Sequence, residues 1–213
     1  REITSIAASR NLKHVGDGAF EGCADLTRIV LPGVEARGAV RAFRRCTKLS
    51  EATFFAERAE EWCYFAPKGN GSKGHPYESL TNLVIAEGSE VIGYREFMSC
   101  TNLVSLRIPS SVTNIESMAF SMCGRLGQGV VIVDGCVLGV NGAAPDELVL
   151  PEGVRLIADS AFQNCSNIVS VVLPSSIRHV GALAFAGCSR LERISVAEGN
   201  PVFHCSDGLL IKG

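Results

Sequence analysis

The sequence predicts a repeat solenoid of mostly β or α/β structure, with parallel strands on one face. Three observations predict it. A unit Ala-Phe-x-x-Cys recurs along the chain, pairs of its copies are 23 residues apart, and a short alternating apolar segment follows most copies. Such a period indicates stacked supersecondary units that bury their apolar residues only against one another.

The Ala-Phe-x-x-Cys unit is the most regular element. Its copies, including variants that replace Ala by Glu or the following Leu by Ile, begin at Ala19, Ala42, Glu96, Ala119, Ala161 and Ala184. Six of the ten phenylalanines and six of the nine cysteines therefore occupy shared repeat positions. The spacing of the apolar residues predicts one or two helical turns with one face directed inward.

The second element has the form Leu-x-x-Ile-x-Ile-Pro and is clearest at 103–109. Its alternation predicts a strand with one buried face, and the proline then ends the pairing and turns the chain. Coils begin at Ile3, Leu26, Leu49, Leu80, Leu103, Leu126, Ile168 and Leu191, with one more strand around Leu148. The sequence therefore predicts about nine repeats of 23 residues.

One solenoid domain is predicted over residues 1–213, with three irregular parts. The coil over 50–79 is lengthened, a β-hairpin insertion is predicted over 127–145, and a second hairpin starts within 200–213. Asp134-Gly135 and Asn141-Gly142 favour type I′ turns, and Asp207-Gly208 repeats the signal.

A period of 20–29 residues headed by L-x-x-L-x-L is typical of leucine-rich repeats. The segments SLRIPSSVTNIESMAFSMCGRL (105–126) and SVVLPSSIRHVGALAFAGCSRL (170–191) resemble the BspA-type leucine-rich repeat of bacterial and protist surface proteins. The resemblance covers nearly the whole chain. It implies a right-handed coil, a cell-surface or secreted location, and a role in adhesion. The sequence has no signal peptide, and we expect a fragment of a longer array.

Composition and motifs exclude several function classes. The chain carries 20 basic and 22 acidic residues, and this near-neutral balance argues against a nucleic-acid binder. No apolar run is long enough for membrane insertion. No nucleotide-binding, metal-protease or nucleophile motif is present, so we predict no catalytic residue, no metal and no cofactor. The chain is predicted not to be an enzyme.

The repeat cysteines are predicted to form a column of buried thiols, because equivalent side chains in stacked coils point the same way and do not converge. Cys63, Cys136 and Cys205 lie outside the repeat, and the sequence leaves open whether they are free or paired. His14 and His179 share one repeat position, which predicts a surface slot. Asp207 beside His204 and Cys205 is better explained by a turn than by a catalytic dyad.

Residues that flank the central apolar position of each strand are predicted to face outward and to form an extended binding surface. They are Arg28 and Val30, Glu51 and Thr53, Asn82 and Val84, Ser105 and Arg107, Glu147 and Val149, Ser170 and Val172, and Arg193 and Ser195. The aromatic residues Trp62, Tyr64 and Tyr77 of the irregular coil are a second candidate, either as interface anchors or as core filling.

The predicted function is a non-enzymatic module for protein or glycan binding or adhesion. Its partner would be a protein or glycan, for example in the host extracellular matrix or on neighbouring cells. A structural spacer that carries another domain is the alternative, and an enzyme is a distant third. The sequence does not determine the ligand or the oligomeric state.

Overall fold

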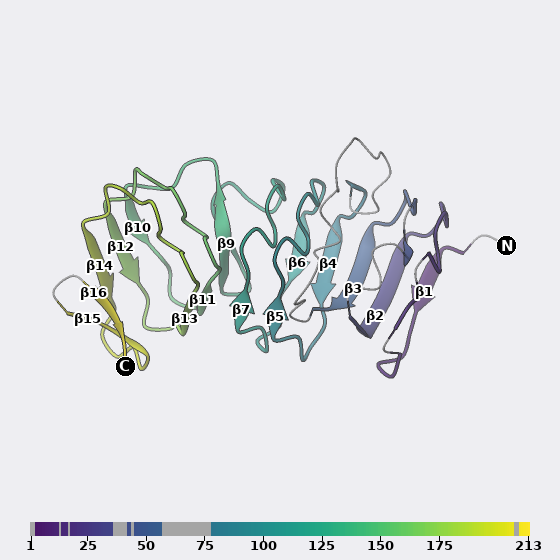
Figure 1. Ribbon diagram of the computed structural model, residues 1–213, viewed down its shortest axis with the longest axis horizontal. Helices are drawn as coiled ribbons and strands as arrows, with labels where there is room; N and C mark the ends of the chain where they lie inside the picture. Colours follow the sequence, from purple (N-terminus) through teal and green to yellow (C-terminus); the bar gives the residue numbers. More distant parts are fainter. Residues whose placement is uncertain are drawn as a thin grey trace. The chain divides into compact units, whose positions relative to one another are not determined.

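The protein is described by a computed structural model over residues 3–12, 14–16, 18–35, 42–43, 45–56, 78–206 and 209–213 (Figure 1). These residues group into two compact units, Arg1–Leu126 and Gly127–Gly213. Each unit is a β-solenoid, and the two are described separately. The predicted repeat solenoid with parallel strands is confirmed.

Unit 1 contains a five-stranded parallel sheet to which each coil contributes one strand, in the order β1-β2-β3-β4-β6. These strands are β1 (Ser5–Ala7), β2 (Arg28–Glu35), β3 (Glu51–Phe55), β4 (Asn82–Ile85) and β6 (Ser105–Arg107). A second parallel pair is formed by β5 (Val91–Ile92) and β7 (Asn114–Ile115). The register pairs equivalent repeat positions, so Ile29 lies beside Ala52 and Leu83 beside Leu106.

Unit 2 contains a three-stranded parallel sheet, β10-β12-β14, and a four-stranded sheet, β13-β11-β9-β8. The strands are β8 (Gly129–Val133), β9 (Cys136–Asn141), β10 (Glu147–Val149), β11 (Leu156–Ile157), β12 (Ser170–Leu173), β13 (His179–Val180) and β14 (Arg193–Val196). A separate antiparallel pair consists of β15 (Phe203–Ser206) and β16 (Leu209–Lys212). Parallel pairing is possible because each coil returns the chain to the same edge before the next strand begins.

The coil over 103–126 illustrates the path of the chain. Strand β6 ends before Pro109, whose carbonyl accepts a hydrogen bond from the Val112 N–H at 3.2 Å. The chain then enters β7 and continues into a turn arm, the segment that carries the Ala-Phe-x-x-Cys unit. Along this coil the apolar side chains point inward and are nearly inaccessible; they are Leu103, Leu106, Ile108, Val112, Ile115, Ala119, Phe120 and Cys123.

In the arms that the structure describes throughout, the chain forms tight turns rather than helices, which corrects the predicted helical turns; in the partly described arm around residue 42, Ala42 is helical. In the coil 103–126 the N–H groups of Ala119 and Cys123 each donate to a carbonyl three residues earlier. Met118 and Met122 have φ angles of 62° and 65°, a left-handed conformation that interrupts a right-handed helix. The same conformation recurs before the Ala and Cys positions of other coils, so each of the arms described throughout is a series of tight turns.

The described residues form about seven solenoid turns rather than the predicted nine. The coil expected to begin at Leu126 is absent, because the chain enters the antiparallel strand β8 instead of adding a strand to a parallel sheet. The strand that follows Leu191, β14, is the last of its sheet and is not followed by another repeat coil. These two coils account for the difference.

Ladders of identical side chains fill the core. Phe20 stacks on Phe43 with ring centroids 5.3 Å apart, and Phe162 stacks on Phe185 at 5.2 Å. The 23-residue period brings these rings into register, so each ring covers its neighbour in the next coil. Because a coil contacts only its neighbours, this stacking makes the core of each unit continuous.

The two predicted hairpins are present. Strands β8 and β9 pair antiparallel around Asp134 and Gly135, whose φ angles of 46° and 74° fit the expected type I′ turn. The predicted turn at Asn141-Gly142 is wrong, because only Gly142 has a positive φ and no antiparallel strand follows it. Strand β9 also pairs in parallel with β11, so the insertion is part of a sheet in unit 2. Strands β15 and β16 form the second hairpin.

Candidate binding surface

In each unit, the outward side chains of the parallel strands line up in two columns. We call these columns the strand face of that unit. In unit 1, one column aligns Arg28, Glu51, Asn82 and Ser105, and the other aligns Ala7, Val30, Thr53, Val84 and Arg107. Between them the side chains of Ile29, Ala52, Leu83 and Leu106 are buried. The alternation predicted from the sequence therefore holds in these strands.

In unit 1 the strand face combines apolar and charged groups. Val84 is 39% exposed, Arg28 and Arg107 are exposed, and Val30 and Asn82 are half-buried. The Arg28 Nε lies 3.6 Å from a carboxylate oxygen of Glu51, but both side chains are at least half exposed. An ion pair this exposed contributes little to stability. These side chains are therefore available for contacts with another molecule.

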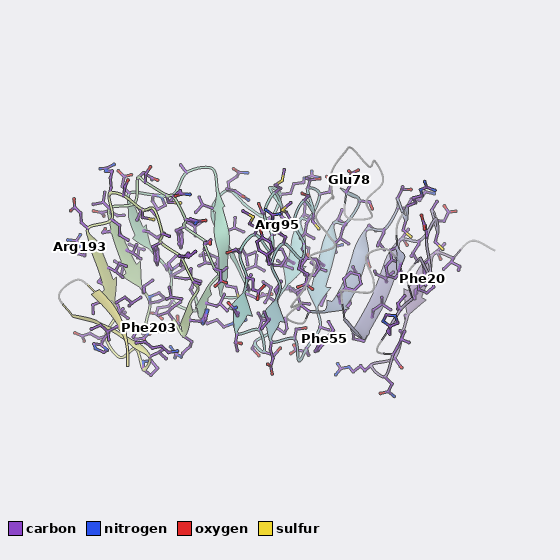
Figure 2. The ribbon with its side chains drawn as sticks, in the orientation of Figure 1. Phe20, Phe55, Glu78, Arg95, Arg193 and Phe203 are labelled. Atoms are coloured by element: carbon purple, nitrogen blue, oxygen red, sulfur yellow. The ribbon has the colours of Figure 1, made fainter. Side chains whose placement is uncertain are left out.

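Unit 2 presents a more apolar strand face. Val149 is 65% exposed and lies in register with Val172, which is 36% exposed, and with Ser195. The second column aligns Glu147, Ser170 and Arg193, the last of which is labelled on β14 in Figure 2. The prediction for Ser170 is wrong. This side chain is only 6% exposed, whereas Val172 on the same strand is 36% exposed.

The charges on the strand face are mixed. One column reads Arg28, Glu51, Asn82 and Ser105 in unit 1, and its counterpart in unit 2 reads Glu147, Ser170 and Arg193, so neither described column is a continuous row of cations. This distribution is unsuited to a phosphate backbone, which requires clustered basic side chains.

Two other features predicted from the sequence are not part of the strand face. Trp62, Tyr64, Tyr77 and Cys63 lie outside the described residues. Cys205 and His204 are exposed on β15, where they pair in register with Leu210 and Ile211. This part of the chain therefore has no buried His-Cys arrangement.

The repeat cysteines follow the predicted column, with differences in depth. Cys46, Cys100 and Cys123 are buried, whereas Cys23, Cys165 and Cys188 are half-buried. Burial raises the pKa of the Cys46 thiol to about 11. All eight cysteines that the structure describes are free thiols.

Cys136, whose state the sequence left open, is a free and buried thiol. It has no exposed surface, and burial raises the pKa of its thiol to about 11. Its place in β9, beside Leu156 of β11, explains this burial. The surface slot predicted for the histidines is correct for His14, but His179 is half-buried and burial lowers its pKa.

Sequence reasoning missed a buried carboxyl group in unit 1. Glu96 occupies the Ala position of its Phe-x-x-Cys unit and is 7% exposed. Its Oε2 accepts a hydrogen bond from the Gly93 N–H at 2.6 Å. Burial raises the pKa of Glu96 to about 8, against the effect of that hydrogen bond and with a smaller contribution from Glu116. The signal in the sequence was a glutamate at a repeat position that alanine occupies in the other coils, which would have indicated a buried carboxyl group.

A second missed feature is a cluster of methionine, tyrosine and arginine on two turn arms of unit 1. Met118 and Met122 are 48% and 64% exposed. The available signal was that all three methionines of the sequence fall within residues 98–122.

Within the described ranges, no helix is long and apolar enough to cross a membrane. The same residues contain no group of three or more His, Cys, Asp or Glu side chains suited to a metal ion.

Comparison with solved structures finds several repeat proteins from bacteria. A leucine-rich cell surface protein from Faecalibacterium prausnitzii A2-165 is 21% identical, with a TM-score of 0.41, over 90% of this chain and 60% of that one. A leucine-rich repeat protein from Eubacterium ventriosum is 18% identical, with a TM-score of 0.41, over 73% and 41% of the two chains. One from Bacteroides ovatus is 16% identical, with a TM-score of 0.34, over 93% and 62%.

The present chain therefore spans less than two thirds of the length of each of these proteins. No curated protein matches it. The family described as "BspA type Leucine rich repeat region" matches in six copies over residues 1–63, 72–130 and 143–204. These ranges cover most of both units and every copy of the Phe-x-x-Cys motif. The chain belongs to the BspA-type leucine-rich repeat family.

Proposed function

We propose that the chain is a non-enzymatic binding module of a cell-surface or secreted protein, and that its strand face engages a protein or glycan ligand. The observation that supports this most directly is the exposure of Val149 and Val172 beside one another on the parallel sheet of unit 2. Their side chains contribute little to the core from this position. Contact with a ligand would remove them from water.

The energetic argument rests on apolar area. Fully burying a valine contributes about 1.5–3 kcal/mol, and Val149 leaves 65% of its surface accessible. Arg193 flanks this pair on the adjacent strand and can donate several hydrogen bonds in one plane. Arginine is one of the residue types enriched at protein–protein interfaces, and here it lies beside exposed apolar area.

The family supports the proposed location and adhesive role. The BspA-type resemblance supports a bacterial surface protein, and the turn arms, strands and hairpins supply a scaffold without an assembled catalytic group among the described residues. Adhesion is therefore the function that best fits an extended, solvent-exposed strand face.

The experiment is a binding screen of the full chain against extracellular matrix proteins and glycans, followed by affinity measurement for each hit. The variant Val149→Asp/Val172→Asp places carboxylates at the centre of the unit 2 strand face. We expect at least a tenfold loss of affinity. Leu183→Asp is the matched control, because Leu183 is 64% exposed in a turn arm of the same unit and should tolerate the change. Circular dichroism verifies that both variants fold.

Retained binding by the double variant would reject the strand face as the site. Failure of every probe to bind would favour the structural spacer, in which the array only separates other domains. Equal loss in the Leu183→Asp control would indicate a general effect of charge and would also reject the assignment.

A further inference from the structure

Two successive turn arms of unit 1 carry a surface unlike the others. Its members are Tyr94, Arg95, Met118 and Met122, which we call the thioether patch. Tyr94 is 42% exposed, Met118 48% and Met122 64%, whereas Arg95 is half-buried. The patch belongs to the arms and not to the strand face. Arg95 is labelled in Figure 2.

Contacts between the two arms hold the patch in a defined arrangement. The Arg95 guanidinium lies over the Tyr94 ring at 4.9 Å from its centroid. Its Nε donates to the Met118 sulfur at 3.3 Å, and the Tyr94 hydroxyl lies 4.0 Å from the same sulfur. The Ser99 hydroxyl donates to the Met122 sulfur at 3.5 Å. Four side chains from two coils are therefore oriented before any partner arrives, which reduces the entropy cost of binding.

The backbone conformation that presents the two methionines is a feature of the repeat. Met118 and Met122 both have positive φ, and so do the residues at the equivalent positions of other coils, among them Arg45, Ser99, Ser160, Asn164, Leu183 and the glycines at 18, 22 and 187. Stacking therefore imposes this conformation on the arms. At Met118 and Met122 it directs long apolar side chains to the surface, where they are exposed and add little to the core.

The chemistry of the patch selects the kind of partner. Tyrosine, methionine and arginine are the residue types enriched at the centres of protein interfaces. Among the residues that the structure describes, no carboxylate lies within ion-pair distance of Arg95. A soft metal cation is disfavoured, because the Met118 sulfur already accepts a hydrogen bond from a cationic guanidinium.

We propose that the thioether patch docks a protein segment in which a carboxylate stands beside an aromatic or aliphatic side chain. The carboxylate pairs with Arg95, and the apolar side chain packs against Tyr94 and the two thioethers. The flexible thioethers adapt to apolar groups of different shape. This site is separate from the strand face, and neither proposal depends on the other.

The test uses the full chain and three sets of synthetic 12-residue peptides, with binding measured by fluorescence polarisation. One set combines Asp or Glu with Phe or Leu, a second replaces the acids by Asn or Gln, and a third keeps the acids but replaces the apolar residues by Ser or Gly. Only the first set should bind, and its affinity should fall as salt is added. Arg95→Gln should weaken binding at least tenfold and remove the salt dependence.

Met118→Asn/Met122→Asn should also weaken binding at least tenfold, and asparagine tolerates the positive φ of both positions. Leu183→Asn is the control in unit 2: it occupies the repeat position of Met118, with φ 57° and 64% exposure, and should bind like the native chain. Circular dichroism checks folding. The proposal is overturned by equal binding of the neutral set, by no binding of any set, or by the same loss in Leu183→Asn. Sedimentation that finds a dimer dissolved by the methionine variant would identify a second copy as the occupant and would also overturn it.

Discussion

The thiol of Cys123 donates a hydrogen bond to the main-chain carbonyl of Phe97 in the preceding coil, with 3.2 Å between sulfur and oxygen. The same bond joins Cys46 to Phe20 and Cys188 to Phe162, at the same distance. The repeated cysteine is therefore a small apolar residue that also satisfies a carbonyl group of the neighbouring coil. This explains why the turn arm uses cysteine where alanine or valine would leave that carbonyl without the bond.

Thiol reactivity should follow this arrangement. At pH 7.5 a maleimide should label Cys205 rapidly, because it is exposed, and should label Cys123 and Cys136 only after denaturation. The raised pKa of Cys136, about 11, further lowers its thiolate fraction. Mass spectrometry of peptides from the native and the urea-unfolded chain measures the difference. Rapid native labelling of Cys136 would contradict its burial in β9.

Replacing a stacked phenylalanine by alanine should lower the free energy of unfolding, and the loss should be larger where neighbouring coils cover more of the ring. Phe162 has no exposed surface, so Phe162→Ala should cost about 3–5 kcal/mol. Its stacking partner Phe185 is half-buried, so Phe185→Ala should lower the free energy of unfolding clearly less in the same assay. Urea denaturation followed by circular dichroism gives both values. Equal losses would mean that the outer face of Phe185 is as well packed as that of Phe162.

Gly181 should not tolerate a side chain. A Cβ there would lie 2.4 Å from the Asp159 nitrogen and 2.5 Å from the Ala158 carbonyl carbon, both in the preceding coil. Because backbone atoms cannot move away cheaply, Gly181→Ala should destabilise the chain by about 1–3 kcal/mol. Gly124→Ala is the control, since a Cβ on Gly124 would have no neighbouring atom within 4 Å. A thermal melt in which both variants behave alike would reject the close approach of the two coils.

Stability should depend on pH through Glu96. Its pKa is about 8 in the folded chain against an ordinary value of 4.5, so the folded state binds a proton that the unfolded state releases. The stabilisation is complete below about pH 4.5 and is lost as pH rises to about 8, at up to about 1.4 kcal/mol per pH unit. Glu96→Gln, which keeps the shape but not the charge, should flatten this slope in urea titrations between pH 5 and 8.

Glu87→Gln, at an exposed site in the same coil, is the control for Glu96 and should keep the slope of the native chain. An unchanged slope in Glu96→Gln would show that another group controls the pH dependence. The alanine found at this repeat position elsewhere, introduced as Glu96→Ala, should also flatten the slope but would leave the Gly93 N–H without its acceptor.

The sequence was sufficient to predict that Phe20 and Phe43 occupy equivalent inward positions of neighbouring coils, because they lie one 23-residue period apart. The outward direction of Val149 and Val172 followed from the period-2 alternation of a strand. Both features depend on spacing alone. The hairpin turn at Asp134-Gly135 was predictable for a local reason, since few residues other than glycine and asparagine or aspartate accept its dihedral angles.

Other features depend on contacts that spacing does not specify. The left-handed φ of Met118 follows from the path that stacking imposes on the arm, and methionine carries no turn signal. Ala158 and Gly181 share a repeat position, yet only the structure reveals how closely the backbone approaches Gly181. The coil expected at Leu126 failed because antiparallel pairing with β9 competes with the parallel register. Cys136 is buried for the same reason.

The register between β10 and β12 pairs Leu148 with Val171 and Val149 with Val172. The first pair points inward and the second outward, and the two are under different evolutionary constraints. Inward positions are constrained by both neighbouring coils, whereas outward positions such as Val149 are constrained much less. A duplicated coil inserted into the stack replaces the core contacts of its neighbours with equivalent ones, and its outward residues can then change with little effect on the core. Such an array can diversify its recognition surface, one coil at a time, while its fold is conserved.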